Sequence, residues 1–236
     1  MTGWRWTAFV AAGCIIAGAA GAQKTSEPRD LGKKPPKGAI VLFNGSDTSA
    51  WVHRGSNEPI RWKVIDGALE VVPGTPDIVT KEEFGDYLLH VEFWLPYMPQ
   101  ATSQARANSG VYNHGRYEIQ VLDSYQNETY KYGGCGALYG VKDPDVSVPR
   151  KPEEWQSYDI TFRAPRFDKE GNMTEKPRLV TVYWNGVKIH QNVEIPVGST
   201  VSGMGGPAPA KGPILLQDHG NPVRYRNIWI KELKLK

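Results

Sequence analysis

Short apolar runs separated by turn residues recur along the chain from Gly38 to its end. Each run is rich in Val, Ile, Leu or aromatic residues, and each break contains Gly, Pro, Asn or Asp. No stretch has the period of an amphipathic helix. Residues 87–95 instead alternate in the way that a strand does when one of its faces covers a core. The pattern predicts one all-β domain over residues 38–236.

The clearest local element is a hairpin. Residues 179–185 and 187–191 are strand-like and are joined by Asn185-Gly186, the dipeptide that best tolerates the positive φ angles of a tight turn. Residues 98–108, 123–155 and 199–212 lack such patterning and are predicted to be long loops. Long loops in compact domains usually form the rim of a functional site.

The first 37 residues follow a different pattern. Residues 1–22 contain Arg5, an apolar stretch and the small-residue sequence Ala20-Gly21-Ala22, which is typical of a cleaved export signal. The apolar stretch is shorter than the ~20 residues that span a bilayer, so a membrane anchor is the weaker alternative, as is lipidation at Cys14. Residues 23–37 are rich in Lys and Pro and predict a flexible linker. We therefore expect an exported protein that is periplasmic or secreted.

Composition narrows the class of protein further. The 236 residues are 40% hydrophobic and 22% charged, which excludes a disordered or collagen-like chain. The net charge of +3 gives no electrostatic reason to expect nucleic acid or acidic lipid as a partner. If the leader is removed, Cys135 is the one cysteine that remains, so no internal disulfide can form. We expect Cys135 to be a small buried or turn residue.

Two strand-like segments carry the candidate chemistry. Residues 116–123 read RYEIQVLD, and alternation places Glu118, Gln120 and Leu122 opposite the apolar face. Residues 214–220 read ILLQDHG, and alternation places Gln217 and His219 together. If both strands lie in one sheet, an acid, two amides and an imidazole form a polar floor suited to a sugar. The alternative is a plainly solvated sheet face.

Metal and nucleotide sites have weaker support. The five histidines are scattered, without the spacing of a zinc site. The Asp143-Pro144-Asp145 loop offers oxygens for calcium or a similar divalent ion, although a solvated turn is the simpler interpretation. The glycine-rich residues 203–212 lack the Lys-Ser/Thr of a phosphate loop.

Eight short motifs occur in one order along residues 38–235. They are Phe43-Asn44-Gly45-Ser46-Asp47 with Trp51, Trp62 with Asp66-Gly67-Ala68-Leu69, Asn108-Ser109-Gly110-Val111, residues 117–123, Gly136-Ala137-Leu138-Tyr139, Asn185-Gly186, residues 212–220 and Arg226-Asn227-Ile228. In this order they resemble the 3-keto-disaccharide hydrolase domain family, formerly a domain of unknown function. The chain departs from the family at Thr48-Ser49-Ala50, where Leu-[Ser/Thr]-Gly is expected.

The resemblance implies a concanavalin-like jelly-roll sandwich of two antiparallel sheets, exported by bacteria, that acts on glycosides oxidised at C3. It implies catalytic roles for Glu118 and His219 and substrate binding by Gln120 and Gln217. Further substrate-binding positions that it implies are Asn108, Ser109, Asp123, Tyr139 and Arg226. For Arg226, the strand parity shared with Ile228 and Ile230 leaves a core-bracing role as the alternative.

The chemistry implied by the resemblance is elimination. A ketone at C3 acidifies the C2 hydrogen, so a base removes it, the C1 substituent leaves and water adds afterwards. Either Glu118 or His219 is the base, and the other assists the leaving group. Two alternatives remain: a non-catalytic carbohydrate-binding module, and an ordinary glucanase, which requires two facing carboxylates. The aglycone, the metal requirement and the oligomeric state are left open.

Overall fold

The computed structural model of the protein describes residues 1–3 and 29–236. The described residues form strands and one short 3₁₀ helix in this order: β1 (Ile40–Phe43), β2 (Trp51–His53), β3 (Lys63–Ile65), β4 (Ala68–Glu70), β5 (Ile78–Thr80), β6 (Tyr87–Trp94), η1 (Ser103–Ala105), β7 (Asn108–Asn113), β8 (Tyr117–Leu122), β9 (Gln156–Arg163), β10 (Arg166–Phe167), β11 (Met173–Glu175), β12 (Arg178–Trp184), β13 (Val187–Glu194), β14 (Leu215–Leu216) and β15 (Arg224–Glu232).

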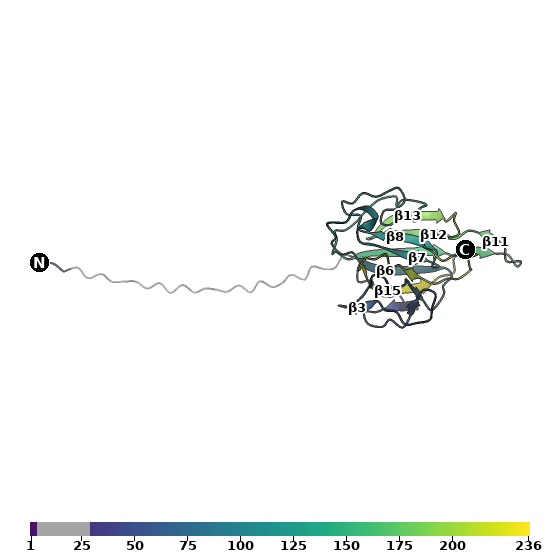
Figure 1. Cartoon of the computed structure of the whole chain (residues 1–236), viewed down its shortest axis with the longest axis horizontal. Coiled ribbons are helices and arrows are strands. Elements are labelled where there is room, and N and C mark those ends of the chain that lie inside the picture. The colour runs from purple at the N-terminus through teal and green to yellow at the C-terminus, as the bar shows by residue number, and fades with distance from the viewer. Residues whose placement is uncertain (4–28) are drawn as a thin grey trace.

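The strands form two antiparallel sheets packed as a β-sandwich (Figure 1). The larger sheet has the order β13-β12-β9-β6-β15-β4-β3, with β1 also paired to β15. The smaller sheet has the order β2-β5-β14-β7-β8. A separate hairpin of β10 and β11 projects from the body (Figure 1). The predicted all-β sandwich of two antiparallel sheets is confirmed.

The predicted hairpin is also present. β12 and β13 pair in antiparallel register, and Asn185 and Gly186 between them have φ angles of 51° and 78°. Two successive positive φ angles match the right-handed twist of the flanking strands, which explains the Asn-Gly sequence.

The core lies between the two sheets. Leu89, Val91 and Phe93 of β6 are fully buried, as alternation predicted, and they belong to one apolar cluster with Ile119 and Val121 of β8. The opposite face of β6 is buried as well, although it carries charged and polar side chains. A second layer of the chain must therefore cover the outer face of the larger sheet.

That layer is the segment just before the sandwich. The Asp30 carboxylate accepts hydrogen bonds from Arg150 at 2.8 and 2.9 Å and from the Ser157 hydroxyl at 2.9 Å. The Gly32 N–H donates to Glu92 at 2.6 Å, and the Lys33 ammonium lies 2.5 Å from Asp159.

The predicted flexible linker over residues 23–37 is therefore wrong for its described part, because charge pairing anchors residues 30–33 to the sheet. The remainder of that linker up to residue 28, and residues 4–22 of the expected leader, lie outside the described residues.

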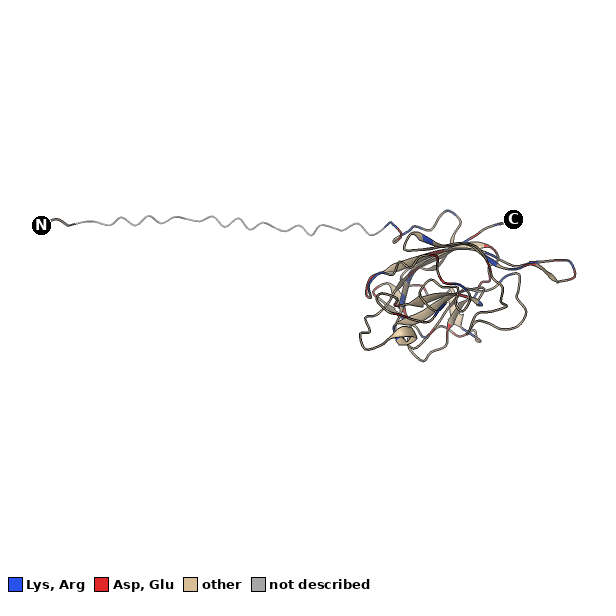
Figure 2. Ribbon diagram, turned by 90° about the horizontal axis from the view of Figure 1, so that it is seen from above, with Lys and Arg blue, Asp and Glu red and all other residues tan. Residues whose placement is uncertain are grey.

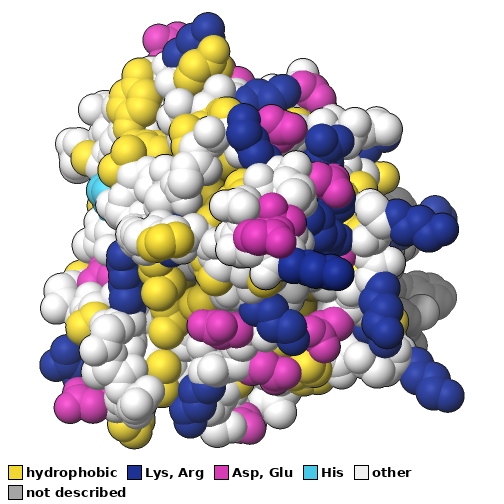
Figure 3. Space-filling model, turned by 90° about the vertical axis from the view of Figure 1, so that its right-hand side faces the viewer, with side chains coloured by type: hydrophobic (Ala, Val, Ile, Leu, Met, Phe, Trp, Pro, Cys, Tyr) yellow, Lys and Arg dark blue, Asp and Glu magenta, His cyan; other side chains and the backbone are white. Residues whose placement is uncertain are grey.

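Positive and negative side chains are intermixed over the protein. Basic and acidic side chains mix along the ribbon and on the face shown by the space-filling view (Figures 2 and 3). This matches the small net charge of +3. In the part of the chain that is described, no helix has the length and apolar character needed to cross a membrane.

The anchored segment covers a buried imidazole held between two carboxylates. His90 Nδ1 lies 2.8 Å from Asp159 and its Nε2 lies 3.4 Å from Glu92. Burial by itself would raise the pKa of Glu92, but hydrogen bonds from His90, Asn227 and Arg226 outweigh it and lower the pKa to about 2. Burial lowers the pKa of His90, but hydrogen bonds to both carboxylates outweigh burial and raise it.

This cluster predicts how stability depends on pH. A carboxyl whose pKa is lowered by folding stabilises the fold when the pH is above the pKa that the group has in the unfolded chain. For Glu92 this stability is lost as the pH falls from about 4.5 towards 2. We expect Glu92→Gln to flatten the acid limb of the stability curve, measured by urea unfolding from pH 3 to 8. Glu232→Gln, an exposed change in β15, should leave the limb unchanged. Equal acid limbs in wild type and Glu92→Gln would contradict the prediction.

Candidate active site

β7, β8 and β14 bring the two candidate segments together in the smaller sheet. In the β7–β8 pair, Tyr112 lies opposite Glu118 and Gly110 lies opposite Gln120. β14 pairs with the other edge of β7, and the Gln217 N–H donates to the Gly110 carbonyl at 3.1 Å. Glu118, Gln120 and Gln217 therefore share one sheet, as the alternation predicted.

These side chains line a small cavity on the outer face of the smaller sheet. Its volume is about 50 Å³. Its walls come from the three strands and from the loops predicted to form a rim. The lining residues are Gln104, Asn108, Tyr112, Glu118, Gln120, Tyr139, Val201, Ser202, Gln217 and His219.

Glu118 is the acidic group of this cavity. Its side chain is buried, and the residue is 3% exposed. Burial raises the pKa of Glu118 to about 8, although a hydrogen bond with the Tyr112 hydroxyl opposes the shift. The carboxyl therefore keeps its proton at pH 7, and can donate it to a bound group.

Gly110 makes room for this carboxyl. A Cβ at position 110 would lie 2.6 Å from Glu118 Oε1 and 2.7 Å from the Tyr112 ring. The Tyr112 hydroxyl accepts a hydrogen bond from the Gln217 amide at 2.9 Å and lies 3.2 Å from the Val201 carbonyl. Glycine is required here because the acid and the phenol both pack over the backbone of β7.

An amide network forms the end of the cavity next to η1. Gln104 Oε1 accepts hydrogen bonds from the Gln120 amide at 3.0 Å and from the Asn108 amide at 3.2 Å. The remaining oxygens, Gln120 Oε1 and Asn108 Oδ1, are buried and have no hydrogen-bond partner. Buried acceptors without partners are costly. Two such oxygens in one cavity fit a ligand that brings hydroxyl donors.

Residues 199–206 cover the cavity. Arg54 donates to the carbonyls of Ser202 at 2.6 Å and Gly203 at 3.1 Å. Arg116 donates to the carbonyls of Gly205 at 2.5 Å and Gly206 at 2.9 Å. Two arginines thus hold this loop by its backbone, with Val201 and Ser202 over the site.

His219 lies at the exposed rim, three residues after the end of β14. The preceding residue, Asp218, is fixed by its N–H, which donates to Asp77 at 3.0 Å, and by its carboxylate, which accepts from the Gly74 N–H at 2.7 Å. An imidazole held at the mouth of a cavity, beside a buried neutral acid, is placed to take part in proton transfer.

Comparison with known proteins gives the family. Residues 38–231 match the model of the 3-keto-alpha-glucoside-1,2-lyase-like domain. The chain belongs to this family. Among curated proteins there is no match.

Solved structures agree with this assignment. A protein from Parabacteroides distasonis ATCC 8503, described provisionally as a glycosyl hydrolase, is 40% identical with a TM-score of 0.75, over 84% of this chain and 85% of that chain. Two more proteins from the same organism, described in the same way, share the fold. One is 20% identical with a TM-score of 0.61 over 84% of this chain and 94% of its own. The other is 24% identical with a TM-score of 0.55, over 83% of this chain and 99% of its own. Family and neighbours together indicate a glycosyl hydrolase-like, carbohydrate-active enzyme.

Within this lyase-like domain, three of the predicted substrate-binding residues lie outside the cavity. Ser109 faces the core, where its hydroxyl donates to the Gln217 carbonyl at 2.6 Å and accepts from the Tyr225 hydroxyl at 2.6 Å. Asp123 is turned towards Arg106, whose Nε lies 2.6 Å from it. Strand alternation explains why Ser109 faces the core: its neighbours Asn108 and Gly110 lie on the opposite face, where the cavity is.

Arg226 lies in the other sheet. Its Nε donates to Glu92 at 2.7 Å, and its guanidinium stacks 4.2 Å from the centre of the Trp155 ring. Neither of the sequence-based interpretations of Arg226 matches this position, because it braces the outer face of the larger sheet. A register shift of β15 between Arg226 and Trp229 breaks the parity on which the core-bracing alternative depended.

Leu122 was also misplaced by alternation. It is fully buried and belongs to the apolar core cluster. Cys135, in contrast, is the small buried residue that was predicted: it is 1% exposed, lies 3.0 Å from the Tyr158 hydroxyl, and burial raises its pKa to about 12.

The acidic loop considered for calcium makes internal contacts. Asp143 accepts a hydrogen bond from the Tyr132 N–H at 2.7 Å, and Asp145 lies 2.5 Å from the Lys142 ammonium. Over residues 29–236, no group of three or more His, Cys, Asp or Glu side chains is arranged to hold a metal ion.

Sequence reasoning missed four lining residues: Gln104, Tyr112, Val201 and Ser202. Tyr112 was detectable, because it shares the parity of Asn108 and Gly110 in β7. The other three lie in loops that were recognised as a rim, but a loop has no periodicity that tells which of its residues face inward.

Proposed function

We propose that this enzyme cleaves 3-keto-glycosides by elimination across C1 and C2. The observation that carries the proposal is the pairing of one buried, neutral carboxyl with one exposed imidazole. Glu118 is the one carboxyl among the described residues that line the cavity, and His219 is the one imidazole. Membership of the lyase-like family supports the same chemistry.

Glu118 takes the role of the acid, because burial keeps its carboxyl protonated at pH 7. His219 takes the C2 proton, which the neighbouring ketone has acidified, and the C2 electron pair forms the C1–C2 double bond. The C1–O bond breaks, and Glu118 gives its proton to the departing oxygen. Addition of water across the double bond then gives the free 3-keto sugar. Gln120 and Asn108, with their unpaired carbonyl oxygens, accept hydrogen bonds from the sugar hydroxyls.

An ordinary glucanase fits this cavity less well. Such enzymes place two carboxyl groups on either side of the scissile bond. Here Gln120 stands next to Glu118 on the same face of β8, and Asp123 points to Arg106 outside the cavity. A non-catalytic binding module would use the same amides, but it has no need for an acid whose pKa is raised to about 8.

Substrate entry requires residues 201–202 to move. A cavity of about 50 Å³ has room for a few water molecules, since one water needs about 10–15 Å³ of such space. Because Val201 and Ser202 form the cover, their displacement opens the space that a sugar ring needs.

The first test is release of the aglycone from a chromogenic 3-keto-glucoside by the purified chain. The unoxidised glucoside and a chelator are run in parallel. We expect release from the keto form alone, with transient absorbance of the unsaturated ketone. Release from both glucosides would favour an ordinary glycosidase, and glycan binding without release would favour a binding module.

The pH profile tests the role of Glu118. As an acid it must be protonated, so kcat/KM should fall about tenfold per pH unit above about 8, where the carboxyl ionises. A rate that keeps rising through pH 9 would mean that Glu118 acts as the base instead.

We also propose that the chain is exported, on the strength of its leader-like first 22 residues. Cell fractionation with N-terminal sequencing of the mature protein tests this. A mature N-terminus near Gln23 in the periplasm or medium is expected, and a cytoplasmic chain that keeps Met1 would contradict it.

A further inference from the structure

Asp77 lies at one end of the smaller sheet, directly before β5. β5 is the middle strand of three, since Ile78 pairs with His53 of β2 on one side and with Leu216 of β14 on the other. The residues that extend these three strands by one position are therefore neighbours across the sheet. They are Arg54, Asp77 and Gln217. The register of the sheet thus places an arginine, an aspartate and the start of the His219 segment in one row.

The two carboxylate oxygens of Asp77 bind different parts of the chain. Oδ2 lies 3.0 Å from Arg54 Nη1, in a partly buried ion pair. Oδ1 accepts a hydrogen bond from the Asp218 N–H at 3.0 Å. The Arg54 N–H also donates to the Asp77 carbonyl at 2.8 Å, so backbone and side chain both hold this pair together. One carboxylate therefore ties Arg54 to the residue that precedes His219.

Arg54 also holds the cover of the cavity, which consists of residues 199–206. Its Nη1 donates to the Ser202 carbonyl at 2.6 Å, and its Nη2 donates to the Gly203 carbonyl at 3.1 Å. A guanidinium has five N–H donors in a rigid plane, so one arginine can bind a carboxylate and two carbonyls at the same time. The cover is therefore fixed to the same guanidinium that Asp77 holds.

The charge of Asp77 reaches the cavity, although its side chain is not part of the lining. Burial is the largest cause that raises the pKa of Glu118, and the Asp77 charge adds to it. The Asp77 charge also raises the pKa of Tyr112, where burial is again the largest cause, and the Arg54 charge opposes it. The ion pair therefore lies close enough to influence the acid of the cavity from outside its wall.

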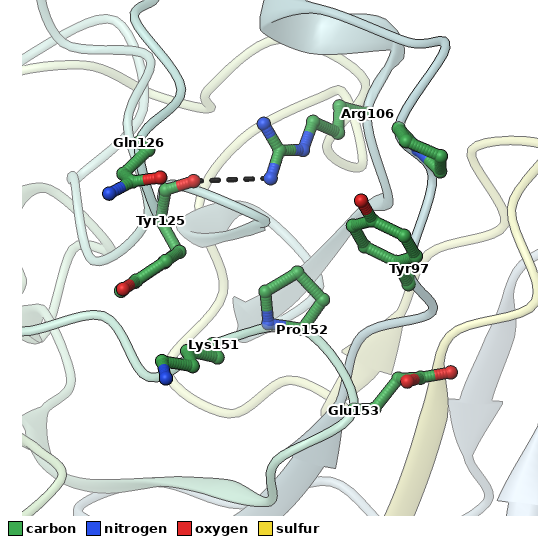
Figure 4. Close-up of a pocket in the computed structure, with 8 residues that line it drawn as sticks. Tyr97, Arg106, Tyr125, Gln126, Lys151, Pro152 and Glu153 are labelled. Carbon is green, nitrogen blue, oxygen red and sulfur yellow. Dashed lines mark hydrogen bonds between the residues drawn. The ribbon is translucent and has the colours of Figure 1, made fainter.

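A second arginine–aspartate pair lacks this connection. Arg106 Nε lies 2.6 Å from Asp123, and Arg106 Nη2 donates to the Tyr125 carbonyl at 3.1 Å (Figure 4). Arg106 lines a separate cavity of about 510 Å³, which shares no lining residue with the cavity around Glu118. Among the described residues, neither member of this pair has a hydrogen bond or ion pair with the cover or with His219. The pair is therefore a matched control for the one at Asp77.

We propose that Asp77 is a positioning residue that couples closure of the cover to the placement of His219. The cover must move to admit a sugar, so its carbonyls leave Arg54 and return to it once the sugar is bound. Asp77 keeps Arg54 in place and binds the Asp218 N–H, so the cover closes against the same carboxylate that orients the imidazole. The inference rests on the proposed function for the catalytic role of His219.

The first test needs no substrate. Hydrogen exchange is followed by NMR at the Met204 amide in the cover, which donates to the Gly115 carbonyl at 2.8 Å. Asp77→Asn keeps an acceptor for the neighbouring N–H but turns an NH2 group towards Arg54. We expect exchange about fivefold faster in both Asp77→Asn and Arg54→Gln, because the closed cover is less stable. Asp123→Asn should leave this exchange unchanged, and a wild-type rate in Asp77→Asn would overturn the coupling.

The same spectra report on the other end of the connection. The ring resonances of His219 should shift in Arg54→Gln, because the change is passed on through Asp77. With Asp77→Asn already present, adding Arg54→Gln should shift these resonances by less than about half as much, since the two contacts share one pathway. An equal shift in the two backgrounds would mean that Arg54 acts on His219 without Asp77, and would overturn the coupling.

Kinetics on the 3-keto-glucoside test the coupling in the reaction. Asp77→Asn and Arg54→Gln should each raise KM about tenfold, the usual effect of losing a hydrogen bond to a charged group. The double variant should be no worse than either single one, because both changes break the same contact. Asp77→Ala also removes the acceptor of the Asp218 N–H, so it should lower kcat about tenfold below that of Asp77→Asn. Asp77→Asn carries the test by itself if Asp77→Ala does not fold.

The two sets of results keep the coupling separate from the proposed reaction. If wild type turns over no keto-glucoside, the proposed function fails, while faster Met204 exchange in Asp77→Asn still supports the link between Asp77 and the cover. If wild type is active but the two KM increases multiply in the double variant, Arg54 and Asp77 act independently, and the coupling is overturned.

Discussion

Replacing Glu118 by Gln is expected to reduce turnover of a 3-keto-glucoside by a factor of about 10² to 10⁴, the usual contribution of a positioned acid or base. The amide has the shape of the neutral carboxyl and can occupy the space above Gly110, but it has no proton to give to the leaving oxygen. The loss should therefore appear in kcat, with KM changed much less.

The same change is expected to stabilise the fold at alkaline pH. The pKa of Glu118 is raised to about 8 by burial, against an ordinary value of 4.5, so the folded chain holds a proton that the unfolded chain releases. Stability is therefore lost as the pH rises from about 4.5 to 8. A glutamine does not ionise, and we expect Glu118→Gln to gain about 1–3 kcal/mol at pH 8 and almost nothing at pH 4.5.

Urea unfolding at both pH values, combined with steady-state kinetics, checks the two effects together. Asp145→Asn is the matched control, because Asp145 is an exposed carboxyl outside the cavity. It should change neither kcat nor the difference in stability between the two pH values by much. Retention of wild-type turnover by Glu118→Gln would remove Glu118 from the mechanism, and equal stability at pH 8 would contradict its raised pKa.

The second large effect is expected from Gly110→Ala. The added methyl would lie 2.6 Å from Glu118 Oε1 and 2.7 Å from the Tyr112 ring, inside van der Waals contact. Both side chains must shift, and Tyr112 then loses its place between the Gln217 amide and the Val201 carbonyl. We expect a loss of about 1–3 kcal/mol in the free energy of unfolding, which is typical of an overpacked site. We also expect at least a hundredfold loss of kcat/KM, because small displacements of catalytic groups are costly.

Gly85→Ala is the control for this substitution. A Cβ at position 85 would meet its nearest atoms at 3.8 and 3.9 Å, which is ordinary contact. Its stability and kcat/KM should stay close to those of wild type. If Gly110→Ala kept full activity, the acid and the phenol would not need the positions that the structure gives them.

Much of the fold was predictable because strand alternation is a local property. In β6, the inward set of Leu89, Val91 and Phe93 follows from a period of two along the chain, and no distant residue is needed to recognise it. The Asn185-Gly186 turn is equally local, since its positive φ angles depend on those two residues. The same rule placed Glu118 beside Gln120 on one face of β8.

Alternation failed where the chain is covered or shifted by distant segments. Ser109 was assigned to the substrate by its place in a motif, although its parity points to the core. Arg226 lies in a different sheet from Glu118, which no local pattern can reveal. The sequence predicted a flexible linker around Asp30, but the structure holds this residue against the larger sheet. Its partners, Arg150 and Ser157, lie more than a hundred residues away, so no local pattern indicates them.

The sequence alone determined the fold class, the inward faces of the strands and the membership of Glu118, Gln120, Gln217 and His219 in a polar set. Only the tertiary structure decided that residues 199–206 close over Glu118 and that Gln104 ties two amides together. The physical reason is that burial is a collective property. The pKa of Glu118 rises because loops from distant parts of the chain exclude water from it, and the strand that carries this residue contains no sign of them.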